Sequence, residues 1–278
     1  MNSVGISFES KCVTYLSAVH KHDNGDLERR PCTGFFWRSA GTPFLITCRH
    51  CVTGVDGNNN NVGDSEFRPT HLQTYFRTPG KKEDDGATFY DNQAIEFILW
   101  QKGVPKWQEH PDGATVDLAA LEYSNACHEV HCVNDKEQPS FRTDAGSDCF
   151  IVGYPEGLGG SEGTPIWKRG SIASEPELKL NGQDCFLVDS ATRSGMSGSP
   201  VFAKLMGDFG PEGVPHSPNE NLKLFGFWTK FLGVYSGRNG VDDYGFQLGR
   251  VWKGDLIAET VSNKNCPAPP WKVMSPTK

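Results

Sequence analysis

Residues 195–202 read GMSGSPVF, and this stretch is the most informative part of the chain. It places Ser197 between two glycines and continues directly into an apolar run. Glycine accepts the backbone angles of tight turns, and a short run of apolar and β-branched residues is typical of a strand. A purely structural hairpin turn has the same composition. The stretch therefore predicts a turn that leads into a strand, and the role of its serine depends on which residues lie beside it in space.

Two stretches further upstream supply the residue types that activate a serine. Residues 46–51 read ITCRHC and residues 116–121 read VDLAAL, so His50 follows one apolar run and Asp117 opens another. Serine needs a base that removes its proton, and the base needs a carboxylate that fixes its tautomer and balances the imidazolium. The three stretches predict a Ser-His-Asp hydrolase, provided that Ser197, His50 and Asp117 meet in the folded chain.

The turn around the serine also has the composition of an oxyanion hole. Acyl transfer places a negative oxygen beside the nucleophile, and backbone N–H groups must point at it. We expect the N–H groups of Gly195 and Ser197 to do this. The nucleophile elbow of an α/β-hydrolase is the alternative, but it requires a glycine where Ser199 stands, a helix after the turn, and the order serine, acid, histidine. None of these three conditions is met.

Asp112 is the alternative to Asp117 as the acid. It lies in the sequence HPDG of residues 110–113, which is typical of a turn in which aspartate caps backbone N–H groups. Asp117 leads an apolar run and is better placed to be buried beside an imidazole. We therefore expect Asp117 to be the acid.

Composition restricts the kind of protein. The chain has 278 residues, 37% of them hydrophobic and 22% charged, and a net charge of −7, which argues against nucleic acid as a partner. No stretch approaches the roughly 20 apolar residues of a membrane span, and no cofactor motif is present. The first residues lack the features of a secretion signal, so we expect a cytoplasmic protein whose nine cysteines are mostly free thiols.

Many short β-type runs separated by turn residues indicate an all-β fold. The chain contains 31 glycines and 18 prolines, and the best helical pattern covers only residues 251–261. The polar residues 134–143 are the expected domain boundary, which divides the chain into residues 1–136 and 137–278. The strand candidates are residues 44–48, 94–100, 117–123, 149–152, 185–188, 200–203, 223–227, 232–235 and 246–251.

Taken together, the motifs resemble those of the trypsin/chymotrypsin-like serine peptidases, in particular the bacterial type without a zymogen N-terminus. The resemblance rests on the order histidine, aspartate, serine and on the stretches TCRHC, VDLA and GMSGSP. Residues 32–36, 153–155 and 232–236 are similar to the strand before the histidine, a loop at the start of the second barrel and the strand after the nucleophile. The similarity covers about residues 33–251.

This resemblance implies two six-stranded antiparallel Greek-key barrels with the active site in the cleft between them and a short C-terminal helix. Residues 1–136 would form the barrel that supplies His50 and Asp117, and residues 137–278 the barrel that supplies Ser197. It implies a serine endopeptidase that acts on protein or peptide substrates through an acyl-enzyme intermediate. A catalytically silent binding module and a latent protease switched on by a regulatory partner are the alternatives.

Three departures from the family pattern bear on regulation. Met196 stands where members activated by cleavage carry an aspartate, and no matching N-terminal sequence is present, so activation by that route is not expected. Ser199 replaces a common glycine. We also expect no leader sequence, whereas most relatives are exported, and this motivates the expectation of regulated activity inside the cell.

The resemblance also implies a substrate pocket near residues 189–191. Asp189 would select a basic residue only if its side chain faced the pocket, and the preferred register places Ala191 there, opposite Phe246 or Leu248. We expect a preference for small or medium apolar residues, whereas Arg193 and Arg238 would favour an acidic residue. The expected pocket residues are Ala191, Arg193, Ser236, Gly237, Arg238, Phe246 and Leu248.

Cysteine and histidine patterns leave two further possibilities. Cys32 and Cys51 could approach each other if their strands form a hairpin, but a reducing compartment opposes a disulfide. Residues 127–132 read CHEVHC, and cysteine and histidine at such spacings can bind zinc. In a strand, His128 and His131 would lie on opposite faces, so this segment is not expected to supply all four ligands. No metal site is expected from the sequence.

Overall fold

The computed structural model describes residues 5–63, 66–82, 88–124, 128–139, 141–207, 226–238, 247–265 and 267. The predicted all-β class with a short C-terminal helix is confirmed. Antiparallel strands dominate these residues, and the α-helices are short: α1 (Phe8–Cys12), α2 (Arg49–Thr53) and the C-terminal α3 (Leu256–Ser262). None of the helices in this part of the chain combines the length and apolarity needed to cross a membrane.

The first half of the chain forms a seven-stranded antiparallel sheet in the order β5-β4-β1-β2-β3-β9-β8. β2 lies near its centre and pairs with β1 on one side and β3 on the other. The strands are β1 (Val13–Lys21), β2 (Leu27–Ser39), β3 (Thr42–Thr47), β4 (His71–Lys82), β5 (Thr88–Ile98), β8 (Gln108–Glu109) and β9 (Ala119–Glu122). The short β6 (Trp100–Gln101) and β7 (Val104–Pro105) form a separate pair.

This sheet differs from the expected six-stranded barrel in strand number and in closure. Among the described residues, the end strands β5 and β8 do not pair with each other. β8 has only two residues and β9 only four, too few to bring the ladder round to β5. A pocket of about 470 Å³, lined by residues including Phe97, Gln108 and Glu122, lies between these strands instead.

The second half forms the expected six-stranded barrel, which closes in the order β10-β11-β12-β15-β14-β13. The two strands expected at residues 223–227 and 232–235 are parts of one strand, β14, although residues 223–225 lie outside the described range. The strands are β10 (Asp148–Gly153), β11 (Ile166–Ile172), β12 (Cys185–Asp189), β13 (Ser199–Gly207), β14 (Gly226–Arg238) and β15 (Leu248–Lys253).

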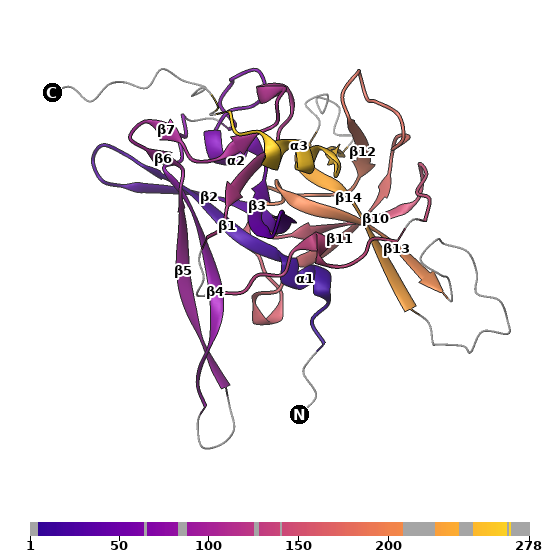
Figure 1. Ribbon diagram of the computed structural model, residues 1–278, viewed down its shortest axis with the longest axis horizontal. Helices are drawn as coiled ribbons and strands as arrows, with labels where there is room; N and C mark the ends of the chain where they lie inside the picture. Colours follow the sequence, from indigo (N-terminus) through magenta and orange to yellow (C-terminus); the bar gives the residue numbers. More distant parts are fainter. Residues whose placement is uncertain are drawn as a thin grey trace.

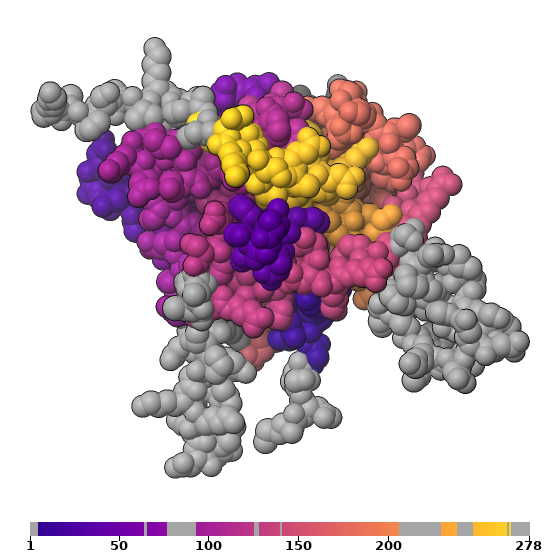
Figure 2. Space-filling model, viewed as in Figure 1, coloured from indigo at the N-terminus to yellow at the C-terminus, as the bar shows by residue number. Residues whose placement is uncertain are grey.

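The two halves share a continuous apolar core. Phe35 of β2 lies 5.6 Å from Phe231 of β14, and Phe231 lies 5.9 Å from Phe202 of β13, measured between ring centroids. The C-terminal helix α3 follows the second barrel but packs against β8 and β9 of the first half. Figure 2 shows this C-terminal segment in yellow on the surface between the magenta and orange parts of the chain. The core positions strands from both halves around one site.

The predicted helix over residues 251–261 begins later than expected, at Leu256, because residues up to Lys253 continue the barrel as β15. The strands of the sheet and of the barrel lie on either side of the predicted boundary at residue 136 (Figure 1). Whether residues 1–136 and 137–278 fold as independent domains stays a prediction.

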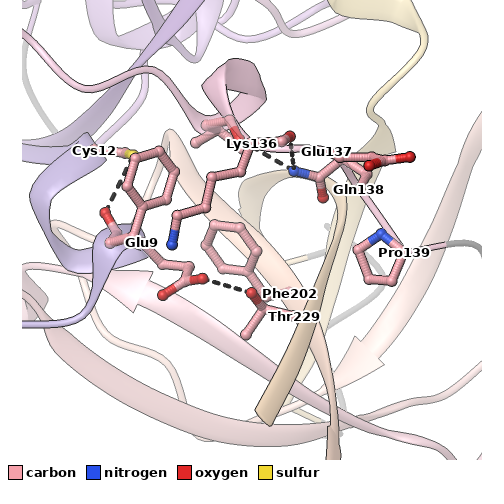
Figure 3. Close-up of a pocket in the computed structure, with 10 residues that line it drawn as sticks. Glu9, Cys12, Lys136, Glu137, Gln138, Pro139, Phe202 and Thr229 are labelled. Atoms are coloured by element: carbon pink, nitrogen blue, oxygen red, sulfur yellow. Dashed lines mark hydrogen bonds between the residues drawn. The ribbon is translucent and has the colours of Figure 1, made fainter. Parts of the chain in front are cut away.

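The segment between the two halves is fastened to the first sheet. Arg38 at the end of β2 pairs with Asp135, with Nε–Oδ1 at 2.6 Å and Nη2–Oδ2 at 3.0 Å. A small pocket of about 170 Å³ lies between this segment, α1 and the second barrel (Figure 3). On its wall the ammonium of Lys136 lies 4.1 Å from the ring centroid of Phe8, and Thr229 donates a hydrogen bond to Glu9. These contacts hold the N-terminal helix on the junction.

Candidate active site

The local fold fixes the backbone around His50. The apolar strand β3 ends at Thr47, and the single turn of α2 follows after Cys48. Gly54 ends this turn with a left-handed φ of 76°, and its N–H donates to the His50 carbonyl at 2.8 Å. Another residue type would be strained here, because a Cβ on Gly54 would lie 1.7 Å from the carbonyl oxygen of Phe67.

Asp117 holds His50 through both carboxylate oxygens. The backbone N–H of His50 donates to Oδ1 at 2.8 Å, and Nδ1 of the imidazole lies 2.7 Å from Oδ2. The His50 and Asp117 side chains are 15% and 19% exposed, so the pair is shielded yet reachable. A carboxylate on Nδ1 directs Nε2 to the other side of the ring as the proton acceptor.

The environment also sets the protonation of His50. Burial by itself lowers the pKa of the imidazole, but the charge of Asp117 and the neighbouring Cys51 raise this pKa well above its usual range. The imidazolium is therefore stabilised relative to an isolated histidine. A raised pKa lets the imidazole hold a proton once it has accepted one, whereas only its neutral form can accept that proton.

Ser236 completes the contacts of the carboxylate. Ser236 lies in β14 of the second half, and its Oγ donates to Asp117 Oδ2 at 2.5 Å. We expect Ser236 in the wall of a substrate pocket, and this role stays a prediction; the structure places its hydroxyl on the acid. No sequence signal showed this, because the two residues are 119 positions apart.

The turn that carries Ser197 is held between the two halves. Thr33 of β2 donates from its N–H to the Ser197 carbonyl at 2.9 Å and from Oγ1 to the Gly195 carbonyl at 2.8 Å. On the other side, the Gly198 N–H donates to the Tyr235 carbonyl at 2.8 Å. The sequence did not identify Thr33 as part of the site, since its only signal is a polar residue in an apolar strand.

Both glycines of the turn are required by its shape. Gly195 and Gly198 have φ values of 90° and 87°, in the left-handed region. A Cβ on Gly195 would lie 2.4 Å from the Tyr154 carbonyl oxygen. In the part of the chain that the structure describes, no acceptor takes the N–H of Gly195 or of Ser197. Both donors are available to a ligand.

One short segment of β14 links these groups. Ser236 binds the carboxylate of Asp117, and a Cβ placed on the next residue, Gly237, would lie 3.6 Å from Ser197 Oγ. The hydroxyl of Ser197 and the acid that holds His50 therefore flank neighbouring residues of the same strand.

The family follows from a comparison with known proteins. The sequence model of the trypsin-like peptidase domain matches residues 32–208, more than half of the chain. The chain belongs to this family of serine proteases. The matched range begins at Cys32, just before Thr33, and includes His50, Asp117 and Ser197.

Three solved structures with a similar arrangement are those of proteases. The HtrA-type protease AlgW with tripeptide has 15% identity and a TM-score of 0.49, over 92% of this chain and 63% of that one. A serine endoprotease from Yersinia pestis has 12% identity and a TM-score of 0.45, over 94% and 67%. Protease Anisep from Arthrobacter nicotinovorans has 15% identity and a TM-score of 0.46, over 90% and 93%. This chain spans less than two thirds of the AlgW chain, and a search of curated proteins finds no significant match.

The expected pocket residues of this trypsin-like peptidase are only partly described. Ala191 and Arg193 are exposed, and Leu248 is half-buried in the first position of β15. Leu248 pairs with Asp189, whose side chain is exposed at the end of β12. Phe246 lies outside the described residues, and for Arg238 only the backbone is described.

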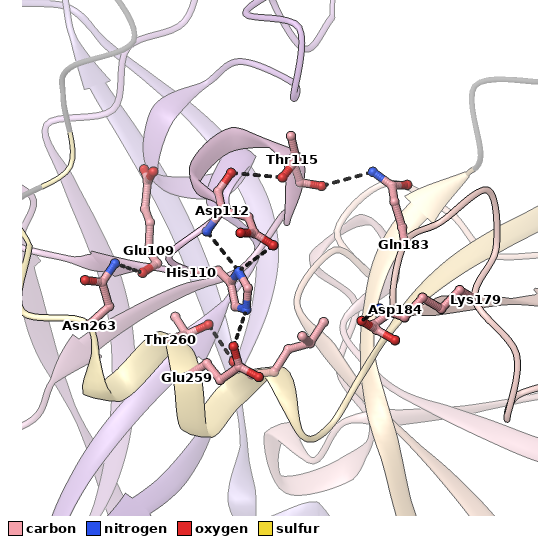
Figure 4. Close-up of polar contacts among 11 residues, drawn as sticks. Glu109, His110, Asp112, Thr115, Lys179, Gln183, Asp184, Glu259, Thr260 and Asn263 are labelled. Atoms are coloured by element: carbon pink, nitrogen blue, oxygen red, sulfur yellow. Dashed lines mark hydrogen bonds and ion pairs between the residues drawn. The ribbon is translucent and has the colours of Figure 1, made fainter.

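Asp112 does not contact His50. Its carboxylate Oδ2 lies 3.7 Å from Nδ1 of His110, and its backbone N–H donates to the same nitrogen at 3.1 Å. His110 also lies 3.2 Å from Glu259 of α3 (Figure 4). Asp112 therefore belongs to a separate polar group between the first sheet and the C-terminal helix.

The structure also shows the surroundings of the Cys32–Cys51 pair and of the CHEVHC segment. Cys32 and Cys51 are free thiols in the structure. Nε2 of His128 forms a hydrogen bond with Oε1 of Gln93 at 2.8 Å. The ring of His131 packs against that of Phe8 in α1, with the ring centroids 5.9 Å apart. The two histidines of the CHEVHC segment thus face different neighbours, and Cys127 lies outside the described residues.

Proposed function

We propose that this trypsin-like serine protease is an endopeptidase in which Ser197, His50 and Asp117 form the catalytic triad. The observation that carries the proposal is the carboxylate of Asp117, which binds both the backbone and the imidazole of His50. The same carboxylate accepts from Ser236, next to the residue that flanks Ser197 Oγ. A carboxylate with these contacts has the position and charge that a base acting on serine requires.

In the first half of the reaction, Ser197 Oγ attacks the carbonyl carbon of the peptide bond while Nε2 of His50 takes its proton. The negative oxygen of the tetrahedral intermediate is stabilised by the N–H groups of Gly195 and Ser197, which have no competing acceptor among the described residues. His50 then protonates the leaving amine, and an ester to Ser197 remains. Water attacks this ester by the same route and restores the hydroxyl.

The serine turn does not depend on a newly released N-terminus. Met196, in the position where cleavage-activated relatives carry aspartate, is fully buried. Thr33 and Tyr235 hold the turn from both sides through backbone hydrogen bonds. These contacts support a site that is formed without cleavage of the chain, so control of activity would require a partner or another ligand.

We further propose small or medium apolar residues as the preferred group before the cleaved bond. The exposed Ala191 carries no charge, and the half-buried Leu248 would supply an apolar wall. Arg193 is exposed and is available to contact an acidic residue instead. A peptide library separates the two preferences, and dominant cleavage after lysine or arginine would contradict both.

The cytoplasmic location remains part of the proposal. Seven cysteines, Cys12, Cys32, Cys48, Cys51, Cys132, Cys149 and Cys185, are buried free thiols. Free thiols are maintained in reducing compartments. A regulated protease of the cell interior, with a regulatory protein as its partner, is consistent with this chemistry.

The decisive test compares two serines in the same turn. Ser197→Ala should lower turnover by about six orders of magnitude and abolish labelling by a fluorophosphonate. Ser199→Ala is the matched control, because Ser199 is fully buried and its hydroxyl has no hydrogen-bond partner among the described residues. Persistent labelling of the Ser197 variant would refute the assignment. Absence of turnover in the wild type would favour a binding module or a latent protease.

A second variant tests the acid. Asp117→Asn should keep the fold but leave His50 in the wrong tautomer, with a loss of about 10⁴-fold in kcat. Unchanged turnover in this variant would remove Asp117 from the mechanism.

A further inference from the structure

Cys48 is a chemically active side chain for which the proposed mechanism has no use. It lies between β3 and α2, is fully buried, and donates from Sγ to the carbonyl of Tyr235 at 3.3 Å. One ligand atom from each of Cys48, His50 and Asp117 lies within 4.8 Å of the other two. The sequence did not predict this group, because Cys48 and His50 are neighbours while Asp117 comes from a distant loop.

We propose that Cys48, His50 and Asp117 form a binding site for a soft divalent cation of the zinc class. The donor set is a thiolate, an imidazole and a carboxylate, the ligand types that zinc prefers. The thiolate and the carboxylate together balance the charge of the ion, and water fills the fourth position. This inference revises the expectation, drawn from the sequence, that the chain has no metal site.

The geometry requires only local movement. Zinc bonds to sulfur of about 2.3 Å and to nitrogen or oxygen of about 2.0–2.2 Å separate neighbouring ligand atoms by roughly 3.5 Å. Nδ1 of His50 and Oδ2 of Asp117 are now 2.7 Å apart and would have to separate by somewhat less than about 1 Å. The three ligand atoms lie within 4.8 Å of one another, so any wider pair would have to approach by no more than about 1 Å.

Binding balances in protons and involves no electron transfer. The Cys48 thiol releases its proton to solvent as the S–metal bond forms. The Nδ1 proton of His50 leaves to solvent as the metal takes its place, and Nε2 keeps its proton or takes one up from solvent, so that the bound imidazole is neutral. The ion loses the water molecules that these three ligands replace.

Groups around the site would orient the ligands. The Ser236 hydroxyl donates to one carboxylate oxygen at 2.5 Å, and the backbone N–H of His50 donates to the other at 2.8 Å. Partners of this kind fix ligand orientation in metal sites. They are present before any ion binds.

The site would make metal binding and catalysis mutually exclusive. The ion would occupy the same nitrogen and carboxylate that hold His50 in its catalytic tautomer, and Nε2 would carry a proton. This consequence rests on the proposed function, whereas binding itself does not. Zinc-class ions would therefore inhibit hydrolysis, and a chelator would restore it.

The experiment uses Co²⁺ as the probe, because a thiolate ligand gives this ion an intense charge-transfer absorption. Reduced, chelator-treated full-length protein is titrated with Co²⁺, and Zn²⁺ is then added as a competitor. We expect one Co²⁺ per chain with a thiolate band that Zn²⁺ abolishes. Cys48→Ala and Cys48→Ser should lose the band and bind at least about tenfold more weakly, since even outer partners of a metal site contribute 10–100-fold.

Cys149→Ala is the matched control, because Cys149 is an equally buried free thiol in β10 of the second barrel. This variant should bind Co²⁺ like the wild type. An unchanged band in either Cys48 variant, or loss of the band in Cys51→Ala alone, would overturn the assignment, as would no Co²⁺ binding by the folded wild type. A Cys48-dependent band in a protein without turnover would support the metal site and refute only the proposed protease function.

Discussion

Arg49 and Glu109 form a buried ion pair directly beside the candidate site. Their side chains are 5% and 7% exposed, and Nε of Arg49 lies 3.0 Å from Oε1 of Glu109. Trp107 donates to the same oxygen at 2.9 Å. The N–H of Nε does not point at Oε1 with hydrogen-bond geometry, and Nη1 has no acceptor among the described residues, so the guanidinium is stabilised mainly by charge. The pair joins the helix of His50 to the strand that precedes the Asp117 loop.

The magnitude of this interaction follows from its distance and burial. Two unit charges 3.0 Å apart attract by about 5–6 kcal/mol at an effective dielectric constant of about 20. Removing either partner leaves the other charge buried without compensation, at a cost of about 3–5 kcal/mol. We expect Arg49→Met and Glu109→Gln each to destabilise the protein by that amount. The amide oxygen introduced by Glu109→Gln would still accept the hydrogen bond from Trp107, so this variant removes the charge and keeps the acceptor.

The double variant separates this pair from general packing effects. With both charges removed, no buried charge remains, so the double variant should be more stable than the sum of the single effects by at least about 2 kcal/mol. Arg142→Met is the matched control, because Arg142 pairs with Asp144 at 2.6 Å but is 81% exposed. Such exposed pairs contribute about 0–1 kcal/mol.

Urea unfolding followed by tryptophan fluorescence measures these differences. Each kcal/mol should shift the midpoint by roughly 0.3–1 M for slopes of about 1–3 kcal/mol per M. Single variants that each cost less than about 1 kcal/mol and combine additively would refute the reasoning, since they would show that neither charge depends on the other.

Three further predictions concern other parts of the molecule. Asp135→Asn should destabilise the protein by about 1 kcal/mol at neutral pH, because the contact with Arg38 lowers the pKa of the Asp135 carboxyl. Because the pKa of the carboxyl is lower in the folded state, the ion pair stabilises the protein fully above the unfolded-state pKa, and this stability is lost as pH falls through the folded-state pKa. The urea midpoints of variant and wild type should therefore converge in acid. A difference that stays constant with pH would contradict this origin. Gly198→Ala should lower the free energy of unfolding by at least about 1–3 kcal/mol, because its Cβ would lie 2.1 Å from the Thr33 carbonyl oxygen. A urea midpoint equal to that of the wild type would show that the turn can relax. Burial raises the pKa of the Cys149 thiol to about 12, so site-resolved mass spectrometry should find it alkylated by iodoacetamide only after unfolding, and rapid native labelling would contradict this.

The local elements around the site were largely predictable. The apolar runs that suggested strands before His50, after Asp117 and after Ser197 correspond to β3, β9 and β13. Each signal is local, because strand periodicity and the backbone freedom of glycine depend on residues that are adjacent in the chain.

The closure of the first sheet was not predictable in the same way. The resemblance implied a six-stranded barrel, but the ladder has seven strands and ends at the two-residue β8. The segment before Asp117 has little strand periodicity, and its path depends on the packing of α3 from the far end of the chain. The side-chain amide of Asn263, at the end of this helix, donates to the backbone carbonyl of Glu109 at 2.8 Å (Figure 4).

The sequence by itself determined the class of fold, the order of the three reactive residues and the turn that carries the serine, because each depends on short-range pattern. Only the tertiary structure decided that Ser236 binds Asp117, that Thr33 holds the serine turn and that Cys48 lies within reach of His50 and Asp117. Periodicity states which face of a strand a side chain occupies, but not which residue of a distant strand lies opposite it. Those contacts arise from the register and packing of strands that are far apart in the chain.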